Sequence, residues 1–421
     1  MRSIAKRWLG LAVAGVSLLS VNVALATEIT VWCWAPEFNG AAVKAAAEAY
    51  AKANPGVTIN VVDFEKGALE QKLQTQLAAG ITDDLPDIVL IEDYGAQKYL
   101  QSFPDAFEPL NASLDYSQFA NYKVELASVG DKTYSVPFDS GATVLYYRTD
   151  LLEQAGFTPA DLDSITWDRY YEIGKKVEEV TGKKMTSHDV ADPGLLRMML
   201  QSAGSWYFGP DGQPNIVGNP VFKAALTELQ KFLQSGIYKP TSGWNDYTGA
   251  FIGGDVASVN SAVWMVGGIK GNPELSGKWG AAQLPRIDGL EGATNYSNWG
   301  GSSWYVLASS AEKAEAIDFL SKVWAGDVEF YQKILVGQGA VGSWLPARAG
   351  AAYSSSDEFF SGQPVWANFS KWIEQIPGVN YGLFTNEADD AVRAQLPALL
   401  EGGNIDEIIA AIDAQVRQQT M

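Results

Sequence analysis

The side chains that carry out most enzyme chemistry are scarce in this sequence. Its 421 residues include one histidine, His188, and one cysteine, Cys33. One residue of each kind cannot form a usual zinc site, and no G-x-S-x-G motif precedes an expected helix. No phosphate-binding glycine motif follows an expected strand. We interpret His188, in the polar stretch 186–189, as a surface loop residue, and the sequence predicts no catalytic residue, metal or cofactor.

Carboxylates, in contrast, are abundant. The chain has 49 Asp and Glu residues, and glycoside hydrolysis requires only two of them, about 5 to 9.5 Å apart. No spacing in the sequence singles out such a pair. A secreted carbohydrate-active enzyme therefore stays open as an alternative.

The 14 tryptophans suggest a different chemistry. Trp167, Trp324 and Trp372 lie within helical patterns, and we expect them in the core. Others stand at strand ends or glycine-rich turns beside polar residues: Trp34, Trp206, Trp244, Trp264, Trp299 and Trp344. Flat aromatic faces suit the apolar faces of sugar rings, while neighbouring Asp, Glu, Asn and Arg can bind the hydroxyl groups. For each of these residues, both a core role and a binding role stay open.

The elements that would position these residues alternate along the first hundred residues. β-rich runs at 29–34, 57–63 and 87–91 are separated by helical patterns at 39–54 and 69–79. This order predicts an α/β fold with crossover connections and a parallel sheet covered by helices on both faces. Ligands bind beyond the carboxyl ends of the strands in such sheets, so aromatic side chains there would face a cleft.

In the segment 134–147, an acidic residue lies between two apolar, β-rich runs. An apolar run, 134–138, leads to Asp139 and a small-residue step, 140–142, before a second β-rich run at 143–147. We expect two strands with a flexible step between them.

The first 26 residues have the features of a secretion signal. Three basic residues precede an apolar run, and Ala24-Leu25-Ala26 gives a small-x-small cleavage pattern. Removing this segment, which holds no acid, would change the formal charge from −19 to −22. Such a chain should repel nucleic acid and anionic membranes. A single cysteine permits no internal disulfide and lies too far from the cut for a lipid anchor, so we expect a soluble protein of the periplasm.

Six stretches in order resemble the family 1 extracellular solute-binding proteins, the sugar receptors of ABC importers that include maltose-binding protein. They are "ITVWCWAPEF", "LPDIVLIEDYG", "YSVPFDSGATVLYYRTDLLEQAG", "TWDRYYEIGKKV", "GDVASVNSAVWMVGGI" and "GGSSWYVLASSAEKAEAIDFLSKVW". The resemblance covers essentially the whole chain after the signal. Within the family, "DIVLIEDYGAQKYLQSF" most resembles the receptors for lactose.

This resemblance implies two α/β lobes of the type II periplasmic-binding-protein fold. Each lobe would hold a mainly parallel sheet flanked by helices, with the ligand cleft between the lobes. We expect the N-terminal lobe in 27–138 with 286–335 and the C-terminal lobe in 139–285 with 336–421. The implied partners of this expected monomer are a sugar, most simply lactose or another galactoside, and the membrane permease. A receptor for a monosaccharide or a polyol is a further alternative.

The resemblance also implies a set of ligand-binding residues. Asp139 would lie on the cleft floor, beside a step that absorbs lobe rotation. The other expected ligand-binding residues are Trp34, Glu37, Glu92, Asp93, Trp206, Trp264, Trp299, Gly300, Gly301, Trp344 and Arg348. Tyr381 and Phe384 are weaker candidates. Several polar positions of maltose-binding protein have no clear counterpart here, which leaves the sugar open.

Overall fold

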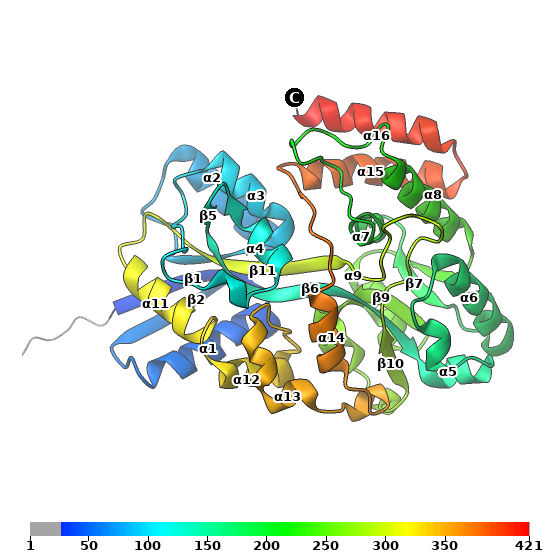
Figure 1. Ribbon diagram of the computed structural model, residues 1–421, viewed down its shortest axis with the longest axis horizontal. Helices are drawn as coiled ribbons and strands as arrows, with labels where there is room; N and C mark the ends of the chain where they lie inside the picture. Colours follow the sequence, from blue (N-terminus) through cyan, green and yellow to red (C-terminus); the bar gives the residue numbers. More distant parts are fainter. Residues whose placement is uncertain (1–26, 421) are drawn as a thin grey trace, which may run out of the picture.

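The computed structural model describes residues 27–420, so the expected secretion signal lies outside the described residues. Figure 1 shows two lobes joined by long strands, as the resemblance to solute-binding proteins implied. The first lobe contains β1 (Thr27–Trp34), β2 (Val57–Phe64), β3 (Ile88–Glu92), β4 (Ser128–Val129), β5 (Lys132–Thr133), α1 (Ala41–Ala51), α2 (Lys66–Ala79), α3 (Asp93–Ser102), α4 (Asn121–Leu126), α11 (Lys313–Val323) and α12 (Val328–Gln338). Within residues 27–420, no helix combines the length and apolar character needed to span a membrane.

The first-lobe sheet has a buried centre at β3 and a partly exposed edge at β2. β1 pairs in parallel with β2 and with β3. Ile88 and Leu90 of β3 enter one hydrophobic cluster, whereas Val89 and Ile91 enter another. This alternation follows from the period of two along a strand, and helices cover each cluster, as expected for a parallel sheet. The strand–helix order predicted from the sequence is confirmed here.

The second lobe carries most of the remaining helices. Its elements are β7 (Thr186–Asp189), β8 (Tyr238–Thr241), β9 (Ser258–Ala262), β10 (Trp279–Ala282), α5 (Thr149–Gln154), α6 (Trp167–Thr181), α7 (Gly194–Ser202), α8 (Pro220–Gln234), α9 (Trp244–Ile252), α10 (Val266–Ile269), α15 (Thr385–Leu400) and α16 (Ile405–Thr420). Trp167, Trp324 and Trp372 are buried in the core, as expected.

β6 (Ser135–Arg148) joins the two lobes as one uninterrupted strand. All 14 of its residues are buried. Its first part pairs with β11 (Asn298–Val306), and its last part pairs with β9 and β10. β9 and β10 both run antiparallel to β6, whereas β7 and β8 pair in parallel, so the second lobe has a mixed arrangement of strands.

The expected separation into two strands at 140–142 is wrong, because β6 is one strand. Its register with β11 shifts twice, and the shift between Ser302 and Ser303 leaves the extra residue in β6 itself, between Pro137 and Asp139. The other shift lies between Asn298 and Gly301. Gly300 and Gly301 have φ of 83° and 86°, a region that glycine adopts without steric cost. The glycines of the returning strand β11 therefore supply the backbone freedom at the crossing.

The stretch after α12 contacts elements of both lobes. Trp344 lies 5.7 Å, between ring centroids, from Tyr331 of α12. Phe369 of α14 (Val365–Ile373) lies 6.3 Å from Tyr146 of β6. Together with the short helix α13 (Ala351–Ser354), this stretch lies beneath the crossing in Figure 1. The division of the chain at 138/139 and 335/336 stays a prediction.

Gly141→Ala should destabilise the ligand-free protein by about 2 kcal/mol, in the range of overpacked sites. A Cβ at Gly141 would stand 2.4 Å from the carbonyl oxygen of Trp299, which is a backbone atom that cannot swing away. Urea unfolding measures the effect. The matched control is Gly267→Ala, where a Cβ meets no atom within 4 Å. Equal stability of the two variants would contradict the close approach of β6 and β11.

Candidate ligand-binding site

A cavity of about 430 Å³ lies at the edge of the second lobe. β7 and the turn into α7 form one wall, the first turn of α9 forms another, and α15 closes one side. Its lining residues are Ser187, His188, Asp189, Ala191, Asp192, Leu195, Arg197, Met198, Phe232, Trp244, Tyr247, Asn260, Trp299 and Arg393. Volumes of this order are typical of small-molecule sites.

Three tryptophans form a cluster at this cavity, which we call the tryptophan cluster: Trp244, Trp264 and Trp299. The ring centroid of Trp264 lies 5.9 Å from that of Trp244 and 5.4 Å from that of Trp299. The indole nitrogen of Trp264 donates a hydrogen bond of 2.8 Å to the carbonyl of Trp299. Trp244 is 51% exposed, which leaves a large apolar face open at the cavity.

Three buried polar atoms of residues that line the cavity lack hydrogen-bond partners among the described residues, and one of them, Nε of Arg197, belongs to the guanidinium that pairs with Asp389. Nε2 of His188 and Oδ1 of Asn260 have no hydrogen-bond partner among the described residues, although both side chains are buried. Leaving a buried polar atom unpaired costs about 1–3 kcal/mol. A ligand that brings hydroxyl groups into the cavity could satisfy both atoms.

His188 is therefore not the surface loop residue that we expected. It stands in β7 and is 7% exposed. Burial lowers the pKa of its imidazole to about 4, although Asp192 and Asp189 oppose this shift. The ring is neutral at pH 7 and offers one donor and one acceptor. The buried strand could not be recognised in the sequence "TSHD", because all four residues are polar and show no alternation of apolar and polar side chains.

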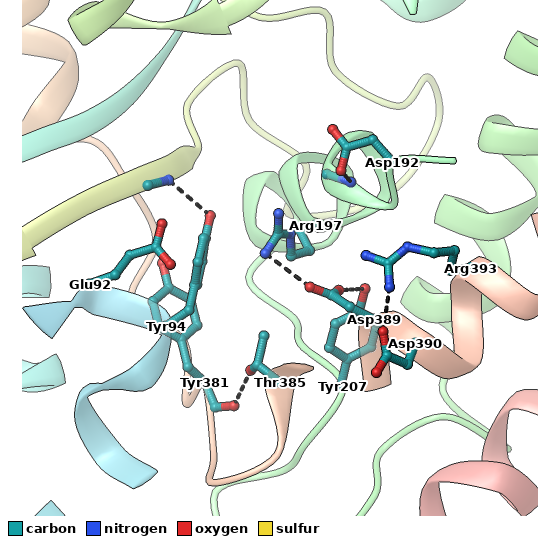
Figure 2. Close-up of polar contacts among 12 residues, drawn as sticks. Glu92, Tyr94, Asp192, Arg197, Tyr207, Tyr381, Thr385, Asp389, Asp390 and Arg393 are labelled. Carbon is teal, nitrogen blue, oxygen red and sulfur yellow. Dashed lines mark hydrogen bonds and ion pairs between the residues drawn. The ribbon is translucent and has the colours of Figure 1, made fainter. Parts of the chain in front are cut away.

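The arginines of the cavity are held by acids of α15 (Figure 2). Arg197 forms an ion pair of 3.0 Å with Asp389, and its guanidinium lies 4.6 Å from the ring centroid of Tyr94, in the first lobe. Arg393 pairs with Asp390 and donates to the carbonyl of Ala191. The contact between Arg197 and Tyr94 places this wall of the cavity against the other lobe.

Among the predicted site residues, Trp299 alone lines this cavity. Glu92 stands at the end of β3, and its carboxylate pairs with Lys66. The Lys66 ammonium lies 6.0 Å from the ring centroid of Trp34. Glu37 is exposed in the short helical segment Pro36–Gly40. These residues form the first-lobe edge of the crossing, and their role in binding stays a prediction.

The predicted acids Asp93 and Asp139 are buried beneath the crossing strands. Asp93 forms an ion pair of 2.5 Å with Lys123, and burial still raises its pKa to about 7. Asp139 accepts two hydrogen bonds of 2.8 Å, from the backbone N–H and the hydroxyl of Ser302. A Cβ at Gly301 would stand 2.8 Å from Asp93. Protein groups occupy Oδ1 of each carboxylate, whereas Oδ2 of Asp93 is buried without a partner among the described residues. Ligand contacts by these acids remain a prediction.

The remaining predicted residues lie away from the cavity. Trp206 is 1% exposed and stacks on Tyr94, with 5.7 Å between ring centroids. Trp344 is buried, and its indole nitrogen donates to Gln118. Arg348 pairs with Glu374. The weaker candidate Tyr381 is fully buried beside Trp206, whereas Phe384 is half-buried against Phe208.

Comparisons with known proteins agree with this architecture. The model of the bacterial extracellular solute-binding protein family matches residues 45–361. The chain is 54% identical, over 414 residues and 98% of each chain, to the lactose-binding protein of Rhizobium radiobacter. The chain belongs to the bacterial extracellular solute-binding protein family. The membership expected from the sequence is thereby confirmed.

Solved structures of other solute-binding proteins share the fold. The GacH receptor of Streptomyces glaucescens aligns with a TM-score of 0.78 at 18% identity, covering 94% of this chain and 98% of its own. The galacto-N-biose-/lacto-N-biose I-binding protein of Bifidobacterium longum aligns with a TM-score of 0.75 at 20% identity, covering 94% and 97%. This solute-binding protein therefore has the two-lobed type II fold predicted from the sequence.

His188→Gln should remove a pH dependence of stability. Unfolded histidine binds a proton near pH 6.5, whereas folded His188 does so near pH 4. The unfolded state therefore holds more protons between these values, and stability falls as the pH drops from about 6.5 to about 4, by up to about 3 kcal/mol.

Urea unfolding of the ligand-free protein and of His188→Gln, from pH 7 to pH 4.5, measures this contribution. Because the chain has one histidine, other groups affect both proteins alike. The difference in unfolding free energy should change with pH. Parallel curves would contradict a buried, neutral imidazole.

Proposed function

We propose that this chain is the sugar-binding receptor of an ABC importer and that it binds lactose or another galactoside. The observation that carries the proposal is the cavity, which combines open tryptophan faces with buried, unpartnered polar atoms. The 54% identity to a protein named for lactose supports the choice of sugar. The receptor would capture its ligand and deliver it to the membrane permease.

The cavity supplies both kinds of contact that a sugar needs. The faces of Trp244 and Trp299 suit the apolar side of a pyranose ring. His188, Asn260 and Asp192 offer acceptors or donors for ring hydroxyls. A disaccharide of about 23 heavy atoms at about 0.3 kcal/mol per atom gives roughly −7 kcal/mol, or a Kd near 10 μM.

The two lobes suit a receptor that closes on its ligand. A ligand that contacts both lobes favours the closed state by its differential affinity. Tyr94 of the first lobe already meets Arg197 of the second at the cavity. The basic and apolar leader at 1–26 supports export to the periplasm. We infer that the protein acts there as a monomer that docks on the permease.

Binding without cleavage is the expected outcome, although the chain has many acids. Asp189 accepts hydrogen bonds from the backbone of Ala191 and Gly243, and Asp192 accepts one from Gly194. These contacts hold the two cavity carboxylates in structural turns. A secreted carbohydrate-active enzyme would require one of them as a proton donor.

Calorimetric titration with lactose, galactose, raffinose and a polyol tests the proposal. Lactose should bind with a Kd at or below about 10 μM, and chromatography should recover it intact. Tighter binding of galactose or the polyol would favour the monosaccharide or polyol alternative. Hydrolysis of lactose, or no binding of any sugar, would refute the receptor proposal.

Trp244→Ala should weaken lactose binding at least about tenfold, because it removes an aromatic contact at the cavity. The unfolding free energy without ligand should change by less than about 1 kcal/mol, since this side chain is half exposed. Trp244→Phe keeps an aromatic plane and should lose much less affinity. Unchanged affinity of the alanine variant would contradict the stacking role.

A further inference from the structure

We propose that Asp389 determines which ligand charge the receptor accepts. Asp389 does not line the cavity, but its carboxylate pairs with the guanidinium of Arg197, which does. Because this pairing neutralises the positive charge of Arg197, the site disfavours anionic sugars. This inference rests on the proposed sugar-binding function and deepens it. The ligand class is a neutral galactoside, and the corresponding sugar acids are rejected.

Asp389 is fixed between two partners (Figure 2). One carboxylate oxygen accepts a hydrogen bond of 2.8 Å from the hydroxyl of Tyr207, and the other pairs with Arg197 at 3.0 Å. The side chains of Arg197 and Asp389 are 13% and 8% exposed. Because little water surrounds these two side chains, the local dielectric constant is low and the attraction between the Asp389 carboxylate and the Arg197 guanidinium is strong. An anionic ligand would have to compete with a carboxylate that is already in place.

The second arginine of the cavity gives no free positive charge either. Arg393 pairs with Asp390. Asp189 and Asp192 line the cavity without a cationic side chain paired to them among the described residues. Four carboxylates therefore surround two guanidinium groups, and the environment is negative.

The uncharged polar groups of the cavity also favour a neutral ligand over an anionic one. Burial keeps His188 neutral by lowering its pKa to about 4, so this residue adds no positive charge at pH 7. Within residues 27–420, Nε2 of His188 and Oδ1 of Asn260 have no hydrogen-bond partner, and both side chains are buried to nine-tenths or more. Asn260 Oδ1 and the carboxylate of Asp192 only accept hydrogen bonds, so they favour a ligand that donates hydrogen bonds from hydroxyl groups. A carboxylate, which only accepts hydrogen bonds, suits Asn260 Oδ1 and Asp192 poorly.

Asp389→Asn isolates the charge with little change of shape. The amide oxygen can still accept the Tyr207 hydroxyl, but Arg197 loses its counter-charge. The matched control is Asp390→Asn, the same substitution at the next position. The side chains of Arg393 and Asp390 are 48% and 61% exposed, and solvent screens such pairs. The control should therefore change ligand selection little.

The experiment is calorimetric titration at pH 7 with lactose, lactitol and lactobionate. Lactitol and lactobionate share an opened second ring and differ in one carboxylate, so their comparison isolates charge. For the unmodified protein, we expect lactobionate to bind at least tenfold more weakly than lactitol. Asp389→Asn should raise the affinity for lactobionate relative to lactitol at least tenfold, and Asp390→Asn less than threefold.

Three results would overturn the inference. The first is equal binding of lactitol and lactobionate by the unmodified protein, which decides the matter even where Asp389→Asn does not fold. The second is a folded Asp389→Asn variant, checked by its thermal transition, that gains no relative affinity for lactobionate. The third is the absence of binding by lactose and both derivatives, which refutes the galactoside proposal itself. Lactose binding without charge selection refutes the inference alone.

Discussion

The pairing of β6 with β11 is the interaction on which the rest of the structure depends. β6 runs unbroken from one lobe into the other, and β11 returns beside it with two glycines at the crossing. Asp139 fastens the strands through two hydrogen bonds to Ser302. Trp299, which lines the cavity, belongs to the same returning strand. The strand connection between the lobes and one wall of the cavity thus belong to a single pair of strands.

Compensation of buried charge is the second principle at work. Two buried cations near the crossing meet a carboxylate: Lys123 pairs with Asp93, and Arg197 pairs with Asp389. Asp139 accepts hydrogen bonds from Ser302 instead. Removing one partner of such a pair leaves an uncompensated buried charge, which is strongly destabilising. Nε2 of His188 and Oδ1 of Asn260 lack partners among the described residues, and they belong to residues that line the cavity, where a ligand would supply the missing hydrogen bonds.

Much of the fold could be predicted from the sequence, because its signals are local. The alternation of strands and helices at 29–91 and the core positions of Trp167 and Trp324 follow from periodicity. Six ordered stretches also identified the family. The unbroken course of β6 was not predictable, because its hydrogen-bond partners on β11 lie about 160 residues further along the chain.

The candidate site was less predictable, because its residues come together only in the fold. His188 and Asn260 stand in short strands, and Asp389 reaches Arg197 from a helix 192 residues away in sequence. Acids at strand ends, such as Asp93 and Asp139, looked like ligand contacts. Their protein partners, Lys123 and Ser302, were visible only in three dimensions.

The crystal structure of the protein with lactose tests the central claim most directly. The account predicts a sugar ring against Trp244 or Trp299, with hydroxyl groups at hydrogen-bond distance from His188 Nε2 and Asn260 Oδ1. It also predicts that Asp389 keeps its contact with Arg197. Lactose bound elsewhere, with this cavity filled only by water, would contradict the account.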